Sequence, residues 1–328
     1  MTPTLHSRRL VMCVAWVVAA SLMIGGAEAQ TFPNRPVRII VPFAAGGPND
    51  AAARLIAEAL RPHLGQSVVV ENRGGAGGLA GAEAVATATP DGYTLLLGTI
   101  GPLVLSPMAK PLRYEPVRDL APIGQIYRSA QVFAAHPKLG VRSMAGLVGY
   151  AKANPGSVKI GSAGLGTLTH LSIEVLRREA AVDVIHVPYR GTSAALSDLL
   201  GGQIDALFGE VSVMTPHVRS DKVVALSITS PERSRLLPEV PTMTEAGFPA
   251  LTLESWGGLL APAGVPADVL TRLEAAVQKA LLEPTFRAGA EKQGWDEVTA
   301  SRNAFAELLA RETVKWKPIA TSPGFKLD

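Results

Sequence analysis

The sequence has little cysteine and no concentration of histidine. Cys13 is the only cysteine in 328 residues, and the six histidines are scattered along the chain. Because Cys13 lies so near the N-terminus, a chain processed beyond it would carry no thiol. That would exclude a disulfide, a thiolate metal site and a cysteine nucleophile. We therefore expect no metal site.

Charge and aromatic content exclude further classes. The formal net charge is only +3 at pH 7, without a block of basic residues, so nucleic acid is not an expected partner. Aromatic residues make up 5% of the chain, and this scarcity, with abundant alanine, glycine and valine, favours α/β layers over an all-β sandwich.

The first 29 residues have the three-part pattern of a secretory signal peptide. His6, Arg8 and Arg9 form a basic start, residues 10–24 are an apolar run, and Ala27-Glu28-Ala29 places small residues at a cleavage site. The apolar run is shorter than the roughly 20 residues of a membrane span. We expect a periplasmic protein cleaved after Ala29. The arginine pair leaves the general and the twin-arginine export routes both open.

The following residues alternate between strand-like and helix-like segments. Strands are expected at 37–41, 68–70 and 93–97, with helices at 50–64 and 79–88 between them. This βαβαβ order is half of a doubly wound sheet.

A second alternation begins near Gln131. It predicts strands at 132–135, 158–160, 184–187, 204–208 and 223–228, with helices at 143–153, 169–180 and 193–200. After Pro231 the pattern indicates a proline-rich loop, a strand near 251–255 and helices at 267–292 and 302–317.

The predicted fold class is α/β, with two doubly wound, Rossmann-like lobes and a ligand cleft between them. About 300 residues exceed what one hydrophobic core usually organises. We expect residues 30–130 to begin lobe 1, residues 131–229 to form lobe 2, and residues 230–328 to return to lobe 1 with C-terminal helices. Such lobes bind ligands at the carboxyl ends of their strands.

Two glycine-rich turns join a strand to a helix, and both could bind an anion. The first is Pro42 to Asp50, and the second is Gly161 to His170. Amides at a helix N-terminus stabilise a carboxylate through hydrogen bonds and the helix dipole. Each turn taken singly is also explained as a tight βα connection without a ligand.

Other motifs do not support catalysis. Residues 75–80 match G-x-G-x-x-A, but the acidic residue about 20 positions later is lacking, so no dinucleotide cofactor is expected. Ser193 departs from the nucleophile elbow at its last glycine. His170 and Glu174 share a helix face, but two ligands do not make a catalytic zinc site. We predict that the chain is not an enzyme.

Seven segments, in order, resemble one family. They cover essentially all of the chain after the signal sequence, and they are Val41-Pro42-Phe43-Ala44-Ala45-Gly46-Gly47 to Asp50, Glu71 to Gly78, Pro90 to Leu95, Gly161 to His170, Val187 to Gly191, Asp198 to Asp205, and Leu237 to Thr242 with Glu245-Ala246-Gly247. The sequence thereby resembles the Bug solute receptors, the substrate-binding proteins of tripartite tricarboxylate transporters.

The resemblance implies a hinge-closing periplasmic receptor of the class II type that captures a small organic carboxylate. Its partners would be membrane permease subunits, and a monomer is expected. Docking on a membrane sensor instead, or a periplasmic hydrolase on the same fold, stays open. The predicted ligand-binding residues come from both glycine turns and neighbouring segments: Phe43, Ala44, Gly46, Gly47, Asn49, Asp50, Thr99, Ser162, Gly164, Gly166, Thr167, Tyr189 and Gly191.

One stretch departs from the family pattern. After Thr99 the family often has a polar T-H-A-x-N-P-like stretch, whereas this chain continues from Ile100 to Pro107 with mainly apolar residues. If Ile100, Leu103 and Val104 formed a cleft wall, the receptor would prefer a carboxylate with an apolar body over citrate or an amino acid.

Overall fold

The structure is a computed structural model that describes residues 32–327. The predicted signal peptide and its cleavage site therefore lie outside the described residues. A short unit ends at Asn34, and a compact unit begins at Arg35 and contains every helix and strand named below. No helix of the described residues is long and apolar enough to cross a membrane.

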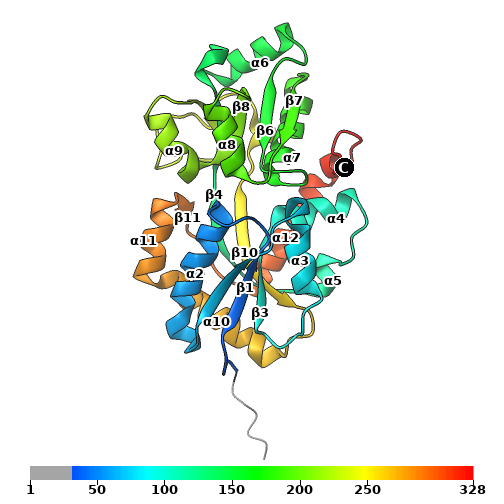
Figure 1. The fold of residues 1–328 in the computed structure, drawn as a ribbon, viewed down its shortest axis with the longest axis vertical. Coiled ribbons are helices and arrows are strands. Elements are labelled where there is room, and N and C mark those ends of the chain that lie inside the picture. Colours follow the sequence, from blue (N-terminus) through cyan, green and yellow to red (C-terminus); the bar gives the residue numbers. More distant parts are fainter. Residues whose placement is uncertain (1–31, 328) are drawn as a thin grey trace, which may run out of the picture. The chain divides into compact units, whose positions relative to one another are not determined.

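The first sheet has six strands in the order β11-β4-β10-β3-β1-β2 (Figure 1). Strand β1 pairs in parallel with β2 and β3, whereas β10 runs antiparallel to β3 and β4. The strands are β1 (Val37–Val41), β2 (Val68–Asn72), β3 (Thr94–Thr99), β4 (Leu120–Ser129), β10 (Ser255–Pro262) and β11 (Trp295–Asp296).

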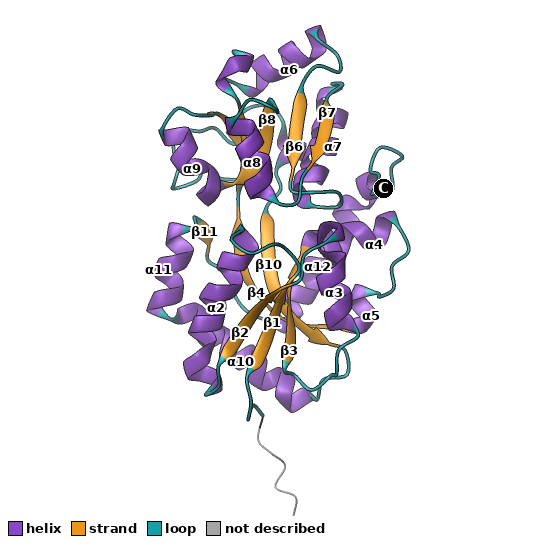
Figure 2. Cartoon of the chain, in the orientation of Figure 1, coloured by secondary structure: helices purple, strands orange, loops and turns teal. Residues whose placement is uncertain are grey.

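Helices pack around this sheet (Figure 2). Helix α2 contacts α10, and α12 contacts β4. The helices are α2 (Pro48–Leu64), α3 (Leu79–Ala86), α4 (Ser106–Ala109), α5 (Pro116–Asp119), α10 (Ala267–Leu282), α11 (Pro284–Lys292) and α12 (Arg302–Ala320), with short turns η1 (Ala76–Gly78) and η2 (Gly101–Leu105).

The second sheet has five strands in the order β7-β6-β8-β5-β9. Strand β6 is parallel to β7 and β8, and β5 is antiparallel to β8 and β9. The strands are β5 (Gln131–Ala135), β6 (Lys159–Ser162), β7 (Ile185–Pro188), β8 (Ala206–Glu210) and β9 (Val224–Ile228). The helices are α6 (Met144–Ala153), α7 (Leu168–Ala180), α8 (Thr192–Leu200) and α9 (Val211–Arg219), with turns η3 (Pro137–Leu139) and η4 (Pro249–Leu251).

The chain crosses between the sheets twice, and the two crossings lie side by side, since Ser129 of β4 pairs with Ser255 of β10. It leaves the first sheet between β4 and β5 and returns between β9 and β10. The Gln131 amide donates to Thr229 Oγ1 at 2.9 Å, and the Thr229 amide donates to the Gln131 carbonyl at 2.9 Å. The expected α/β class with two sheet-centred lobes is confirmed, but both sheets are mixed rather than all parallel.

Ordinary helix and core signals explain most of these elements. Ile56, Leu60 and Leu64 recur at helical spacing in α2 and are buried, and Gly65, at φ 67°, ends that helix in the left-handed region. In the second sheet, Phe133 and Phe208 stack with their centroids 4.0 Å apart across β5 and β8.

Sequence reasoning missed β4 and α9. Pro122 and Gly124 interrupt the alternation of β4, which pairs with β10 through two register shifts. Helix α9 has nine residues and contains Pro216, and a proline inside a helical segment predicts a break rather than a helix. The segment predicted as one helix at 267–292 is two, because Pro284 begins α11.

Candidate functional site

A cavity of about 130 Å³ lies where strands of both sheets end. Its lining residues follow β1, β3, β6 and β7 or end β8, and Gln131 and Ser255 begin the strands β5 and β10. The lining is Phe43, Ala44, Ala45, Gly47, Pro48, Asn49, Thr99, Gly101, Gln131, Ala163, Thr167, Leu168, Thr169, Arg190, Gly191, Thr192, Ser193, Glu210 and Ser255. The carboxyl ends of parallel strands are where α/β folds bind ligands, so this cavity is the candidate site.

Three helices begin at the cavity. Residues 47–49 open α2 in the first sheet's half, whereas residues 167–169 and 191–193 open α7 and α8 in the other half. The first amides of a helix have no acceptor within it. Helix α7 satisfies one of them with the side chain of Thr167. Neither α2 nor α8 has a side-chain cap, so their first-turn amides are available to a ligand.

The Phe43–Gly47 turn is held in its conformation by Asp50. One carboxylate oxygen of this buried residue accepts from the Gly46 amide and from Arg54 Nε, each at 3.0 Å. Burial raises the pKa of Asp50, but the hydrogen bonds from Arg54 and Gly46 outweigh it, so the pKa lies below its ordinary value. The Asn72 side chain also donates to the Phe43 carbonyl, at 3.2 Å. Asp50 Oδ2 therefore holds the turn, while the buried Oδ1 of Asp50 has no hydrogen-bond partner among the described residues.

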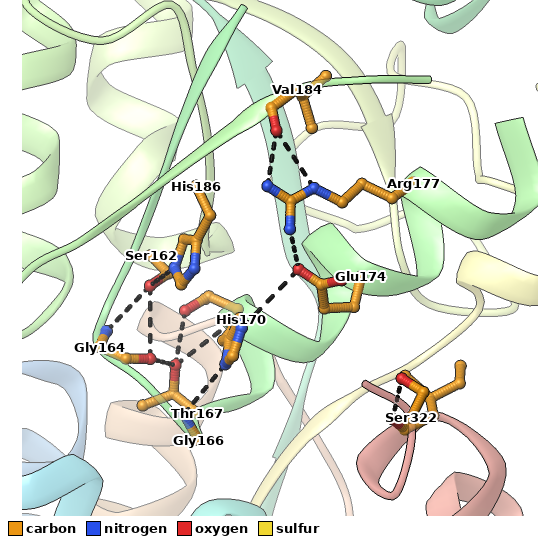
Figure 3. A network of polar contacts seen from close by, with 12 residues as sticks. Ser162, Gly164, Gly166, Thr167, His170, Glu174, Arg177, Val184, His186 and Ser322 are labelled. Carbon is orange, nitrogen blue, oxygen red and sulfur yellow. Dashed lines mark hydrogen bonds and ion pairs between the residues drawn. The ribbon is translucent and has the colours of Figure 1, made fainter. Parts of the chain in front are cut away.

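Contacts within the second turn use most of its amides (Figure 3). The Gly166 amide donates to His170 Nδ1 at 3.2 Å, and the Gly164 amide donates to Ser162 Oγ at 3.2 Å. Thr167 Oγ1 donates to the Gly164 carbonyl at 2.7 Å. These amides hold the turn on α7, which leaves little of it for an anion.

Two neutral histidines lie behind this turn. His170 and His186 stack with centroids 4.3 Å apart, and Ser162 Oγ lies 2.6 Å from His186 Nε2. Burial lowers the pKa of His170 to about 3 and that of His186 to about 4. Glu174 pairs with Arg177. Among the described residues, no group of three or more His, Cys, Asp or Glu side chains could hold a metal ion.

The start of α8 is held in place by neighbouring groups. The Gly191 amide donates to the Ala163 carbonyl at 3.0 Å, and the Tyr189 hydroxyl donates to Asp198 Oδ2 at 2.7 Å. Thr192 and Ser193 follow as the first two helical residues and line the cavity. Arg190 lines it too and is exposed.

Gln131, Glu210 and Ser255 form a polar floor at the ends of β5, β8 and β10. Burial raises the pKa of the Glu210 carboxyl to about 7, although hydrogen bonding to Ser255, Ser129 and Gln131 acts in the other direction. Glu210 stands directly across from Gln131 in the register of β8 and β5. The floor thus adds a carboxyl group whose pKa burial raises to near neutral.

The predicted site residues divide between this cavity, its neighbour and the supporting structure. Those that line the cavity are Phe43, Ala44, Gly47, Asn49, Thr99, Thr167 and Gly191. Gly164 and Tyr189 line an adjoining cavity of about 510 Å³, which shares Phe43, Ala44 and Gly191. Gly46, Asp50, Ser162 and Gly166 line neither of the two.

The predicted ligand-binding residues included neither Thr192 and Ser193 at the start of α8 nor the polar floor. The first had a detectable signal, because Gly191 follows a predicted strand and precedes a predicted helix. Glu210 directly follows apolar residues at the end of β8, where side chains reach a ligand site.

The predicted apolar wall is wrong. Ile100, Leu103 and Val104 are at most 5% exposed, belong to the hydrophobic core and do not line the cavity. From this stretch only Thr99 and Gly101 reach it. Residues 101–105 form the turn η2, which directs the apolar side chains inward.

Comparison with known proteins identifies the family of this chain. Residues 52–325 match the model of the tripartite tricarboxylate transporter family receptor, TctC. Protein BugT of Bordetella pertussis is 33% identical over 325 residues, which are 98% of this chain and all of that protein. A UPF0065 protein from the tcbD-tcbE intergenic region of a Pseudomonas species is 35% identical over 92% of this chain and 91% of its own.

Solved structures agree in fold over most of the chain. The periplasmic binding protein BugD is 35% identical, with a TM-score of 0.83 over 88% of this chain and 97% of its own. An R. palustris protein solved with adipate is 31% identical, with a TM-score of 0.83 over the same shares. MatC from Rhodopseudomonas palustris, solved with malate, is 33% identical, with a TM-score of 0.82 over 88% of this chain and all of its own. The chain belongs to the TctC family of tripartite tricarboxylate transporter receptors, which includes the Bug solute-binding proteins.

Proposed function

We propose that this protein is a periplasmic receptor that captures a small organic carboxylate between the N-termini of α2 and α8. One observation carries the proposal: helix α2 of the first sheet's half and helix α8 of the other half both begin at one cavity, and neither has a side-chain cap. Backbone amides and two helix dipoles favour an anion there without a dedicated arginine. The similar proteins solved with adipate and malate support a carboxylate.

Binding closes two lobes in this proposal. Residues 35–130 and 255–327 form one lobe and residues 131–254 the other, because Leu237 and Val240, which follow β9, belong to the core of the second sheet. The paired crossings at Ser129 and Ser255 act as the hinge. Two crossing segments permit rotation of one lobe against the other while holding its axis. The turns already approach closely, since a Cβ atom on Gly101 would lie 2.8 Å from the Gly166 carbonyl oxygen.

Family membership supports a periplasmic receptor that serves a tripartite transporter. In our proposal the receptor is exported with cleavage after Ala29, acts as a monomer and delivers its ligand to the membrane permease subunits. Docking on a membrane sensor is the alternative, and a binding assay with each purified membrane partner separates the two.

A hydrolase is disfavoured by the position of its best catalytic pair. Ser162 Oγ and His186 Nε2 lie within hydrogen-bond distance. Yet Ser162 is fully buried and does not line the cavity, and the lowered pKa of His186 makes the imidazole a weak base. The pair supports the second turn instead, and we propose that the protein has no catalytic function.

Calorimetric titration of the purified protein with adipate, succinate, malate and citrate tests the proposal. At least one acid should bind saturably at one site, and at about 100 times its dissociation constant it should stabilise the fold by roughly 2.7 kcal/mol. Failure of every acid to bind or to raise the melting temperature would refute a carboxylate receptor.

A further inference from the structure

One acidic side chain of the cavity has unmet hydrogen-bonding capacity. Glu210 ends β8 and lines the cavity. Its Oε2 atom is buried and has no hydrogen-bond partner among the described residues. A buried carboxyl oxygen without a partner is costly unless it carries a proton or a ligand supplies a donor.

The surroundings of Glu210 contain polar neighbours but no paired cation. The hydrogen-bonding neighbours of the Glu210 carboxyl group are Ser255, Ser129 and Gln131. Tyr127 is a titratable group nearby, and its hydroxyl donates to Asn49 Oδ1 at 2.7 Å. Arg190 is the one cationic side chain among the cavity's lining residues, and it is exposed. Among the described residues, Glu210 forms no ion pair that would occupy its free Oε2 atom.

We propose that Glu210 is a specificity-determining residue that accepts a hydrogen bond from a hydroxyl or ammonium group on the carboxylate ligand. The inference rests on the proposed function, because the helix N-termini must hold the ligand carboxylate while Glu210 in the polar floor accepts a hydrogen bond from the ligand's hydroxyl or ammonium group. A site that offers a buried acceptor rejects an analogue lacking the donor, since the acceptor then stays unpaired. The receptor should therefore prefer hydroxy- or amino-substituted acids over their unsubstituted counterparts.

The affinities of the two ligand types should respond differently to pH. A ligand donor stabilises the ionised Glu210 carboxylate, so the affinity of a hydroxy acid should rise as pH increases through the pKa of the free receptor, about 7. An unsubstituted dicarboxylate gains nothing from that charge and is repelled by it, so its affinity should stay level or fall over the same interval.

Malate and succinate form a matched ligand pair, because they differ only in one hydroxyl group. Calorimetry with the intact mature protein at roughly pH 6.5 and pH 8 should show the preference for malate growing with pH. In E210Q the malate affinity at the higher pH should drop about tenfold, as expected for loss of a hydrogen bond to a charged group. The succinate affinity should stay the same or increase.

Glu254→Gln is the control variant. Glu254 is also a carboxyl group whose pKa burial raises, but it lines a different cavity, and its partner is Arg128 at 3.4 Å. E254Q should keep the wild-type ratio of malate to succinate affinity at both pH values. If E210Q fails to fold, the pH dependence of this ratio in the wild-type protein still decides the question.

The outcomes separate this inference from the proposed function. A wild-type ratio that does not move with pH, or an E210Q variant that weakens both acids equally, would overturn the role of Glu210 while leaving the carboxylate receptor intact. Binding of neither malate nor succinate, nor of any other carboxylate, by the wild-type protein would refute both.

Discussion

A proline at the first position of α8 would delete one backbone amide from the site. Thr192 is that position, and its amide has no acceptor within the helix. Proline fits the first helical turn, and the preceding Gly191, at ψ 162°, already has the extended ψ value that a residue before proline prefers. Thr192→Pro should therefore remove a donor from the cavity with little loss of fold stability.

The magnitude follows from the charge of the acceptor. A hydrogen bond to a charged group contributes about 1.5–3 kcal/mol. Since 1.4 kcal/mol corresponds to a factor of ten, T192P should weaken carboxylate binding by roughly 10- to 150-fold. Calorimetry gives the affinity and a thermal melt gives the stability of each variant.

Two matched variants isolate the amide. Thr192→Val keeps the amide and the shape but removes the hydroxyl, so it should bind within about threefold of wild type if the amide is the ligand's donor. Ala267→Pro places proline at the first position of α10, which does not line the cavity, and should bind like wild type. Wild-type affinity in T192P, or an equal loss in T192V, would refute recognition by this amide.

Three further predictions concern the supports of the site. Gly101→Ala should weaken binding several-fold, because the added Cβ atom would lie 2.8 Å from the Gly166 carbonyl oxygen. Gly149→Ala is the control and should bind like wild type, because no heavy atom lies within 4 Å of the Cβ atom added there. Equal calorimetric affinities of the two variants would contradict this prediction. Asp50→Asn should flatten the acid dependence of the melting temperature below about pH 4, because a carboxylate with a lowered pKa contributes stability that is present above its unfolded pKa and lost as pH falls through the folded one; an unchanged acid profile would show that Asp50 does not contribute. Arg190→Ala should cost less than about 1 kcal/mol of binding and mainly reduce its salt dependence, since the side chain is exposed; a loss as large as that of T192P would assign the anion to a side-chain charge.

The sequence was sufficient to predict the alternation of elements because local signals agree with the final packing. Gly65 ends α2 where the helical spacing ends, and the apolar stretch at 94–97 is a buried central strand. Local signals failed at β4, because a strand carrying Pro122 and Gly124 is stabilised by pairing with β10, which is more than a hundred residues away.

The candidate site was predictable only in outline. A strand, a glycine turn and a helix suffice to place residues such as Gly47 and Gly191 near a ligand. Whether an amide is free depends on the exact conformation of the turn, because a side chain only four residues further along can accept from it. His170 accepts from the Gly166 amide, and Asp50 accepts from the Gly46 amide. Likewise, the sequence could not show that Ile100 packs into the core while Glu210 reaches the cavity.

A crystal structure of the protein with a bound dicarboxylate tests the central claim most directly. We predict one ligand carboxylate in the cavity, with its oxygens about 2.7–3.2 Å from first-turn amide nitrogens of α2 and α8, such as those of Asn49 and Thr192. A ligand bound elsewhere, or one held in the cavity by Arg190 alone without these amides, would contradict it.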